Sequence, residues 1–240
     1  MSECVTTPLC PLCGHPAEEG RWTDMHGRRL YRCGRCRLIY ASPKDLPAPE
    51  AERARYLLHR NTPEDAGYVR FLRRLWEPVR ELLPTPFPAG AHLLDYGSGP
   101  EPVMAGLIRA EGVPCDIYDP FFAPEPPSNA PYAAILACEV VEHFHEPRKS
   151  WGHLCSLLAS GGYLGVMTSL APDTPEAFAR WSYAGDFTHV AFYGEETRRK
   201  IAEMFGLRMM ESPGAGVQLF QKRHRVCCGD GGGRQGACVS

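Results

Sequence analysis

From residue 91 onward, short apolar runs alternate with longer amphipathic stretches. Helices are expected near 102–111 and 147–159, between the apolar runs AHLLDY, CDIYD, YAAILAC and GYLGVMT. This order predicts a parallel sheet with helices on both faces, because parallel strands are joined by helical crossovers. The chain continues with a helix at GEETRRKIAEMF and then with LRMMES and VQLFQK, which a PGAG turn separates. These last two segments predict a terminal antiparallel hairpin.

The segments before and after this region have other patterns. Residues 46–90 predict a helical lid or linker, with helices at PEAERARYLLHR and PEDAGYVRFLRRLWEPVRELL and a candidate lid turn at 59–63. The segment VCCGDGGGRQGACVS ends the chain and is rich in glycine, so we expect residues 226–240 to form a disordered tail. A second metal site is the alternative for the tail cysteines, Cys227, Cys228 and Cys238.

Four cysteines near the N-terminus form two C-x-x-C pairs. CPLC and CGRC are separated by nineteen residues, and the intervening segment is too short to fold around a core of its own. Paired knuckles of this kind can deliver four thiolates to one tetrahedral zinc ion. We therefore predict a structural zinc ribbon over residues 1–45. Its ligands are Cys10, Cys13, Cys33 and Cys36.

Composition narrows the class of partner. The chain has 240 residues, 44% of them hydrophobic, and a formal net charge of -2, so it has no overall attraction to nucleic acid or to anionic membrane. No apolar run reaches the length of a membrane-spanning helix, and the first residues lack the pattern of a secretory signal. We therefore expect a cytoplasmic protein without membrane partners. Eleven cysteines in such a chain favour reduced thiols or metal ligands.

The stretch LLDYGSGPEP predicts a strand, a glycine turn and a helix start. Gly97 and Gly99 allow the backbone to approach a ligand at the helix N-terminus. Pro102 stands where the dinucleotide fingerprint requires a third glycine, so the pattern disfavours NAD. The next strand ends at Asp119, where a carboxylate can accept both hydroxyls of an adenosine ribose.

The glycine turn, the acid at the next strand tip and an apolar strand entering E-x-x-E-H together resemble the class I S-adenosylmethionine-dependent methyltransferases over residues 91–222. The resemblance implies a Rossmann-like sheet with helices on both faces and a C-terminal hairpin, and we assign residues 91–225 to this domain. It also implies S-adenosylmethionine as the cofactor. The implied contacts are Asp95, Gly97 and Gly99 at the methionine portion, Asp119 at the ribose and Phe121 beside the adenine, with Glu139 as a further cofactor contact.

The cysteine knuckles and one substitution refine this resemblance. With the knuckles in front, the chain is similar to a group of bacterial methyltransferase-domain proteins that carry an N-terminal zinc ribbon. Many members have glycine where this chain has Glu101, and a carboxylate there would repel the carboxylate of the cofactor unless it turns away. Weakened cofactor binding is the implied consequence.

The segment ILACEVVEHFHEP gathers ligand-type side chains after a strand. If a helical turn begins after Cys138, then Glu139, Glu142 and His143 share one face and suit Mg²⁺, Mn²⁺, Fe²⁺ or Zn²⁺. The alternative is that the carboxylates only cap a helix. A similar arrangement in the ubiquinone-pathway O-methyltransferases and the small-RNA 2′-O-methyltransferases implies His189 as a fourth ligand. His145 has no assigned part.

Three functions stay open at this point. The first is O-methylation of a small-molecule hydroxyl, with Glu142, His143 and His189 as catalytic residues. The second is methylation of RNA or protein, with the ribbon arginines Arg28, Arg29 and Arg32 as the recognition surface. The third is an inactive zinc-ribbon adaptor, which only Glu101 supports. The methyl acceptor and the oligomeric state are not determined by the sequence.

Overall fold

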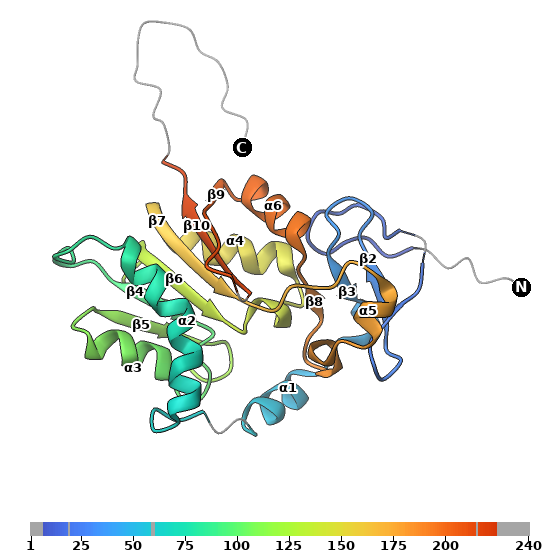
Figure 1. The fold of residues 1–240 in the computed structure, drawn as a ribbon, viewed down its shortest axis with the longest axis horizontal. Helices are drawn as coiled ribbons and strands as arrows, with labels where there is room; N and C mark the ends of the chain where they lie inside the picture. The colour runs from blue at the N-terminus through green and yellow to red at the C-terminus, as the bar shows by residue number, and fades with distance from the viewer. Residues whose placement is uncertain (1–6, 19, 59–60, 215, 225–240) are drawn as a thin grey trace, which may run out of the picture.

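The computed structural model describes residues 7–18, 20–58, 61–214 and 216–224, and its centre is a six-stranded sheet in the order β5-β4-β6-β7-β10-β9 (Figure 1). The first four of these strands along the chain run parallel, and β10 pairs antiparallel with both β7 and β9. The predicted parallel sheet with a terminal hairpin is confirmed. The strands are β4 (Leu93–Tyr96), β5 (Cys115–Tyr118), β6 (Tyr132–Cys138), β7 (Leu158–Met167), β9 (Leu207–Met209) and β10 (Val217–Lys222).

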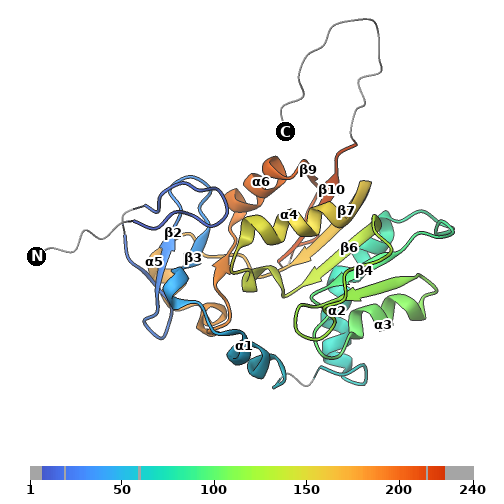
Figure 2. The same cartoon turned by 180° about the vertical axis from the view of Figure 1, so that it is seen from behind.

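Helices cover both faces of the sheet (Figure 2). Side chains of β6 alternate between the faces, because successive residues of a strand point to opposite sides. Ile135 and Ala137 pack in one core with residues of α4 and α6, whereas Ala134 and Leu136 pack in another with α2 and α3. The four helices are α2 (Ala66–Leu82), α3 (Val103–Ala110), α4 (Pro147–Leu157) and α6 (Glu195–Met204).

Helix α2, which the sequence placed in the lid or linker region, packs directly on the sheet. Leu72, Leu75 and Val79 are buried in the core that also holds β6 and β10. The approach is so close that a Cβ at Gly165 of β7 would lie 2.6 Å from Val79 Cγ2. The shorter helix α1 (Pro49–Tyr56) precedes α2 in the chain. The domain boundaries at 45, 90 and 225 stay predictions.

The ribbon forms a second sheet with a strand of the main domain. Its order is β1-β2-β3-β8, and β8 comes from the segment that follows β7 by more than twenty residues (Figure 1). Trp22 and Ile39 from the ribbon share a core with Phe178 and Phe192. The ribbon is therefore packed into the main domain. The elements are β1 (Trp22–Thr23), β2 (Arg29–Arg32), β3 (Ile39–Ala41), β8 (Ala191–Phe192) and α5 (Pro175–Ala179), with short 3₁₀ turns η1 (Pro43–Asp45), η2 (Val141–His143) and η3 (Ser182–Gly185).

The predicted tail at 226–240, with its three cysteines, and positions 59 and 60 of the predicted lid turn lie outside the described residues. None of the helices within the described ranges has the length and apolar character needed to cross a membrane.

Candidate active site and zinc cluster

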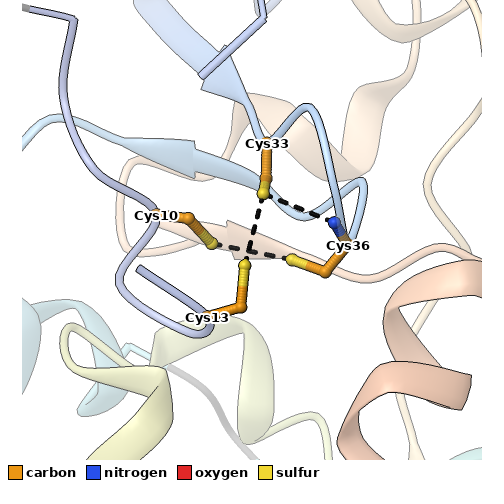
Figure 3. Close-up of side chains that lie close together, drawn as sticks. All are labelled: Cys10, Cys13, Cys33 and Cys36. Carbon is orange, nitrogen blue, oxygen red and sulfur yellow. Dashed lines mark hydrogen bonds between the residues drawn. The ribbon is translucent and has the colours of Figure 1, made fainter. Parts of the chain in front are cut away.

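The two cysteine knuckles bring their four sulfur atoms together (Figure 3). Cys10 Sγ lies 3.6 Å from Cys36 Sγ, and Cys13 Sγ lies 3.5 Å from Cys33 Sγ. Four sulfurs around a tetrahedral zinc at about 2.3 Å would lie about 3.8 Å apart. The backbone N–H groups of Arg35 and Cys36 also point at Cys33 Sγ, at 3.3 and 3.4 Å. The cluster fits one structural zinc ion, as expected of a zinc ribbon.

A cavity of about 760 Å³ lies at the carboxyl ends of β4, β5 and β6. This is the edge at which open α/β sheets bind their ligands. One end is formed by the glycine turn after β4, and the other by η2, by His189 and by α1. A ligand in this cavity can therefore contact both predicted halves of the site.

The glycine turn has the geometry of a cofactor cradle. Gly97 and Gly99 have φ angles of 79° and 67°, which favour glycine. A Cβ at Gly97 would lie 2.4 Å from Val140 Cγ2, whereas the space above Gly99 is open. Between them, the buried Ser98 Oγ has no hydrogen-bond partner in the described residues. A bound molecule with polar groups, such as the methionine portion of S-adenosylmethionine, would satisfy this hydroxyl.

Asp119 ties the loop after β5 to the glycine turn. Its Oδ2 accepts from Gly99 N at 2.9 Å, and its Oδ1 accepts from Phe121 N at 2.8 Å and Phe122 N at 3.1 Å. Asp119 and Phe121 both line the cavity, as the cofactor site requires. The remaining lone pairs of the carboxylate can still accept the hydroxyls of a ribose. Glu101 is exposed at the edge of the same cavity, so solvent weakens its repulsion of an anion.

Asp95 lies behind the glycine turn and does not contact the cavity, unlike the direct cofactor contact that the sequence predicts. It is 4% exposed and does not line the cavity. Its Oδ2 accepts the backbone N–H of Ala105 at 3.2 Å, in the first turn of α3. Burial raises the pKa of Asp95 to about 7. The carboxylate thus supports the helix behind the glycine turn, and a direct contact with the cofactor stays a prediction.

The acceptor end differs from the expected helical turn at its first residue. Glu139 has a φ of 53°, in the left-handed region, and the 3₁₀ turn begins two residues later at Val141. As a result Glu139 is outside the group of possible metal ligands but still lines the cavity. Candidate ligand atoms of Glu142, His143 and His189 lie within 4.8 Å of one another. Three of the four predicted metal ligands are therefore brought together.

Both histidines point the same ring nitrogen at a main-chain carbonyl. His143 Nδ1 lies 3.0 Å from the oxygen of Thr188, and His189 Nδ1 lies 2.7 Å from the oxygen of Tyr183. A carbonyl can only accept, so each Nδ1 carries the proton and each Nε2 keeps a free lone pair. Burial lowers the pKa of both rings, that of His189 to about 4. Neutral imidazoles held in this way are suited to binding a metal ion.

Glu142 places a carboxyl group near these rings. It is fully buried, and its Oε1 accepts the hydroxyl of Tyr183 at 2.5 Å. Its Oε2 is buried without a hydrogen-bond partner in the described part of the chain. Burial raises the pKa of this carboxyl group. A carboxyl group with one unpaired oxygen and two imidazoles, with candidate ligand atoms within 4.8 Å of one another, form a donor set that a divalent cation fits.

Helix α1 closes the acceptor end and was not assigned to the site from the sequence. Its Glu52 is 3.0 Å from His145 Nε2, and its Arg55 forms an ion pair with Asp186 at 2.7 Å. The ring of Tyr56 meets His143 edge-on, with centroids 5.2 Å apart. The sequence does not identify these residues as part of the site, because acidic and aromatic residues are common in charged surface helices. His145 thus pairs with a residue of helix α1 at the acceptor end of the cavity.

Tyr183 also belongs to the acceptor end of the site, through both its hydroxyl group and its ring. Its hydroxyl lies between Glu142 and Thr168 Oγ1, the latter at 3.1 Å, and its ring lies 4.3 Å from that of His189 between centroids. Tyr183 therefore orients two of the three clustered ligands.

Comparisons with known proteins agree with this geometry. A family model described as a methyltransferase domain matches residues 68–212. No curated protein matches the chain. Among solved structures, the chain is similar to a putative methyltransferase from Bacillus halodurans C-125. The two are 19% identical, the match covers 58% of this chain and 70% of that chain, and the TM-score is 0.43.

Two further solved structures resemble the chain. One is a complex between the Haloferax volcanii Trm112 methyltransferase activator and a putative methyltransferase. The identity is 10%, the match covers 72% of this chain and 97% of that chain, and the TM-score is 0.49. The other is an O-methyltransferase family protein from Burkholderia thailandensis, at 14% identity, 72% of this chain, 63% of that chain and a TM-score of 0.47. All three scores are below 0.5, so the assignment rests on the family model, which spans more than half of the chain. The chain belongs to the methyltransferase-domain family and has the Rossmann-like fold of the S-adenosylmethionine-dependent methyltransferases.

Proposed function

We propose that this methyltransferase acts on a hydroxyl group of a small molecule and that a divalent cation at Glu142, His143 and His189 assists it. The observation that carries the proposal is the unpaired Glu142 Oε2 beside two imidazoles whose Nδ1 atoms are already engaged. His143 and His189 of this donor set line the cavity whose other end is the glycine turn, and Glu142 is fully buried next to them. The two ends can therefore hold an acceptor and a methyl donor against each other.

The cofactor end would hold S-adenosylmethionine by three kinds of contact. The backbone of Gly97 and Gly99 and the unpaired Ser98 hydroxyl would face its methionine portion, Asp119 would accept from its ribose, and Phe121 would flank its adenine. When bound, the cofactor supplies an activated methyl group, so the protein has only to align and deprotonate the acceptor.

The acceptor end would bind and deprotonate the hydroxyl group. A divalent cation held there supplies positive charge that lowers the pKa of the acceptor. If the cation is absent, the free Nε2 of His143 or His189 remains in place to take the proton as a general base. Tyr183 and the carbonyl of Thr188 keep the clustered side chains in orientation in either case.

The charge of the cavity supports a small acceptor over RNA. Described residues lining it include one lysine and no arginine, and a phosphate backbone would meet repulsion there. Arg28 and Arg32, two of the arginines considered for RNA binding, have side chains only 17% and 11% exposed and are paired with Asp24 and Glu18. The carboxylates that line the cavity are Glu52, Glu101, Asp119, Glu139, Glu146 and Asp186.

Calorimetric titration with S-adenosylmethionine tests the cofactor half. We expect Asp119→Ala to weaken binding by about a hundredfold, because hydrogen bonds to a charged acceptor contribute about 1.5–3 kcal/mol each. Glu101→Gln is the matched control, an exposed carboxylate at the edge of the same cavity, and should bind at least as tightly as the wild type. Unchanged affinity in Asp119→Ala would remove this residue from the cofactor site, and a wild-type protein that does not bind would contradict the proposed function.

A further inference from the structure

Arg28 of the ribbon is half-buried against the segment that carries His189. Its side chain is 17% exposed, and its Nε donates to Asp24 Oδ2 at 2.9 Å. The other oxygen of Asp24 accepts the backbone N–H groups of His26 and Arg28, both at 2.9 Å. The guanidinium is therefore fixed at its base by the turn between β1 and β2, and its two Nη atoms point away from the ribbon.

These two nitrogens donate to main-chain carbonyls of one short segment. The shortest bonds are from Nη1 to Phe187 O at 2.8 Å and from Nη2 to His189 O at 2.9 Å. Nη2 also lies 3.1 Å from Ala184 O and 3.4 Å from Asp186 O, so it is shared among three acceptors. A planar guanidinium can satisfy converging carbonyls in this way, whereas an ammonium group lacks its fixed fork of donors. Residues 184–189 are thus folded around one arginine.

Backbone hydrogen bonds also connect the ribbon to the residue that follows His189. Val190 O accepts from Ala41 N of β3 at 2.9 Å, and Val190 N donates to Glu142 O at 2.9 Å. Residue 190 is therefore bonded at once to the ribbon and to the turn that carries Glu142. The zinc knuckle lies directly before β3, since Cys33 N donates to Leu38 O at 2.8 Å. Arg28 therefore holds the carbonyl of His189, and β3 holds the carbonyl of the next residue, Val190.

We propose that Arg28 is a positioning residue of the acceptor site, and that the ribbon fixes through it the loop that presents His189. Its significance for catalysis rests on the function proposed above, but its effect on the loop does not. Without the guanidinium, the carbonyls of Ala184, Phe187 and His189 lose the donor that Arg28 provides, and the loop opens to replace it with water. The imidazole of His189 then loses its fixed place near Glu142 and His143.

Hydrogen exchange of the zinc-loaded full-length protein, followed by NMR, tests this role without turnover or cofactor. In Arg28→Met we expect the amides of Thr188, His189 and Val190 to exchange at least about tenfold faster, while amides of β6 and β7 keep their protection. In Arg28→Lys the exchange rates of these amides should lie between those of the wild type and Arg28→Met, because lysine restores the charge and one or two of the hydrogen bonds. Arg29→Met is the matched control, since Arg29 is the exposed neighbour whose guanidinium lies over Tyr31, and it should match the wild type.

The side-chain spectrum of the histidines gives a second signature. In the wild type we expect His189 to show the Nδ1–H tautomer, and in Arg28→Met to show averaged tautomers. Equal exchange at 188–190 in Arg28→Met and wild type would overturn the proposal. A uniform acceleration that includes β6 and β7 would also overturn it, because it would indicate general destabilisation. If Arg28→Met does not fold, the same comparison is made on Arg28→Lys, whose local exchange must exceed that of Arg29→Met.

Discussion

Replacing Cys33 with serine is expected to release the zinc and to destabilise the whole chain. Zinc binding contributes about 10–16 kcal/mol to small zinc domains, so losing one thiolate should cost at least about 5 kcal/mol here. The effect should spread beyond the ribbon, because Cys10, Cys33 and Leu38 share a core with Val141 of η2 and with α4. A loss of this size would lower the Tm by about 10–20 °C in a chain of this length.

Calorimetric unfolding together with metal analysis measures this effect. Cys155→Ser is the matched control, because Cys155 is also buried but lies outside the cluster. It should keep one zinc per chain and lose only about 1 kcal/mol. Two independent unfolding transitions, of which only one changes in Cys33→Ser, would show that the ribbon and the main domain are not coupled as their shared core indicates.

Glu142→Gln is expected to lower methyl transfer by about a thousandfold while leaving the affinity for S-adenosylmethionine within about twofold of the wild type. Glutamine keeps the shape of the side chain but removes the charge at the unpaired Oε2. The glycine turn and Asp119 are at the other end of the cavity, so the cofactor site should not change.

The assay follows a labelled methyl group from S-adenosylmethionine into a panel of hydroxylated small molecules that the wild type methylates. Glu146→Gln is the control, since Glu146 lines the cavity, is largely exposed and pairs with Lys149. It should retain near-wild-type turnover. Full activity in Glu142→Gln, or a loss of cofactor affinity equal to the loss of turnover, would contradict the role assigned to Glu142.

The sheet, the cysteine cluster and the glycine turn could be predicted because their signals are local. Apolar runs such as YAAILAC, paired cysteines and a D-x-G-x-G turn each fall within a few residues, and the physical requirement acts over the same distance. His189 was proposed beside Glu142 and His143 from its place in a loop after the GYLGVMT strand and from family resemblance, because no periodicity links residues so far apart in the sequence. The structure places the three candidate ligands together.

The remaining features depend on contacts that no local pattern encodes. Glu139 was expected on the face of a helical turn, but its left-handed φ delays the turn and separates it from the cluster. Strand β8 has two residues, too few for an alternating pattern, yet it joins the ribbon to the main domain. Helix α2 shows an amphipathic pattern that fits a lid and a sheet-covering helix equally, and only its packing on β7 distinguishes them.

Native mass spectrometry of the wild type with S-adenosylhomocysteine and Mn²⁺ tests the central claim most directly, because one mass reports zinc, cofactor and second metal together. We expect the chain to carry one zinc, one S-adenosylhomocysteine and one Mn²⁺, and we expect His189→Ala to lose only the Mn²⁺. A wild-type spectrum with zinc but no Mn²⁺ would contradict the metal-assisted acceptor site, and a spectrum without S-adenosylhomocysteine would contradict the cavity as the site of methyl transfer.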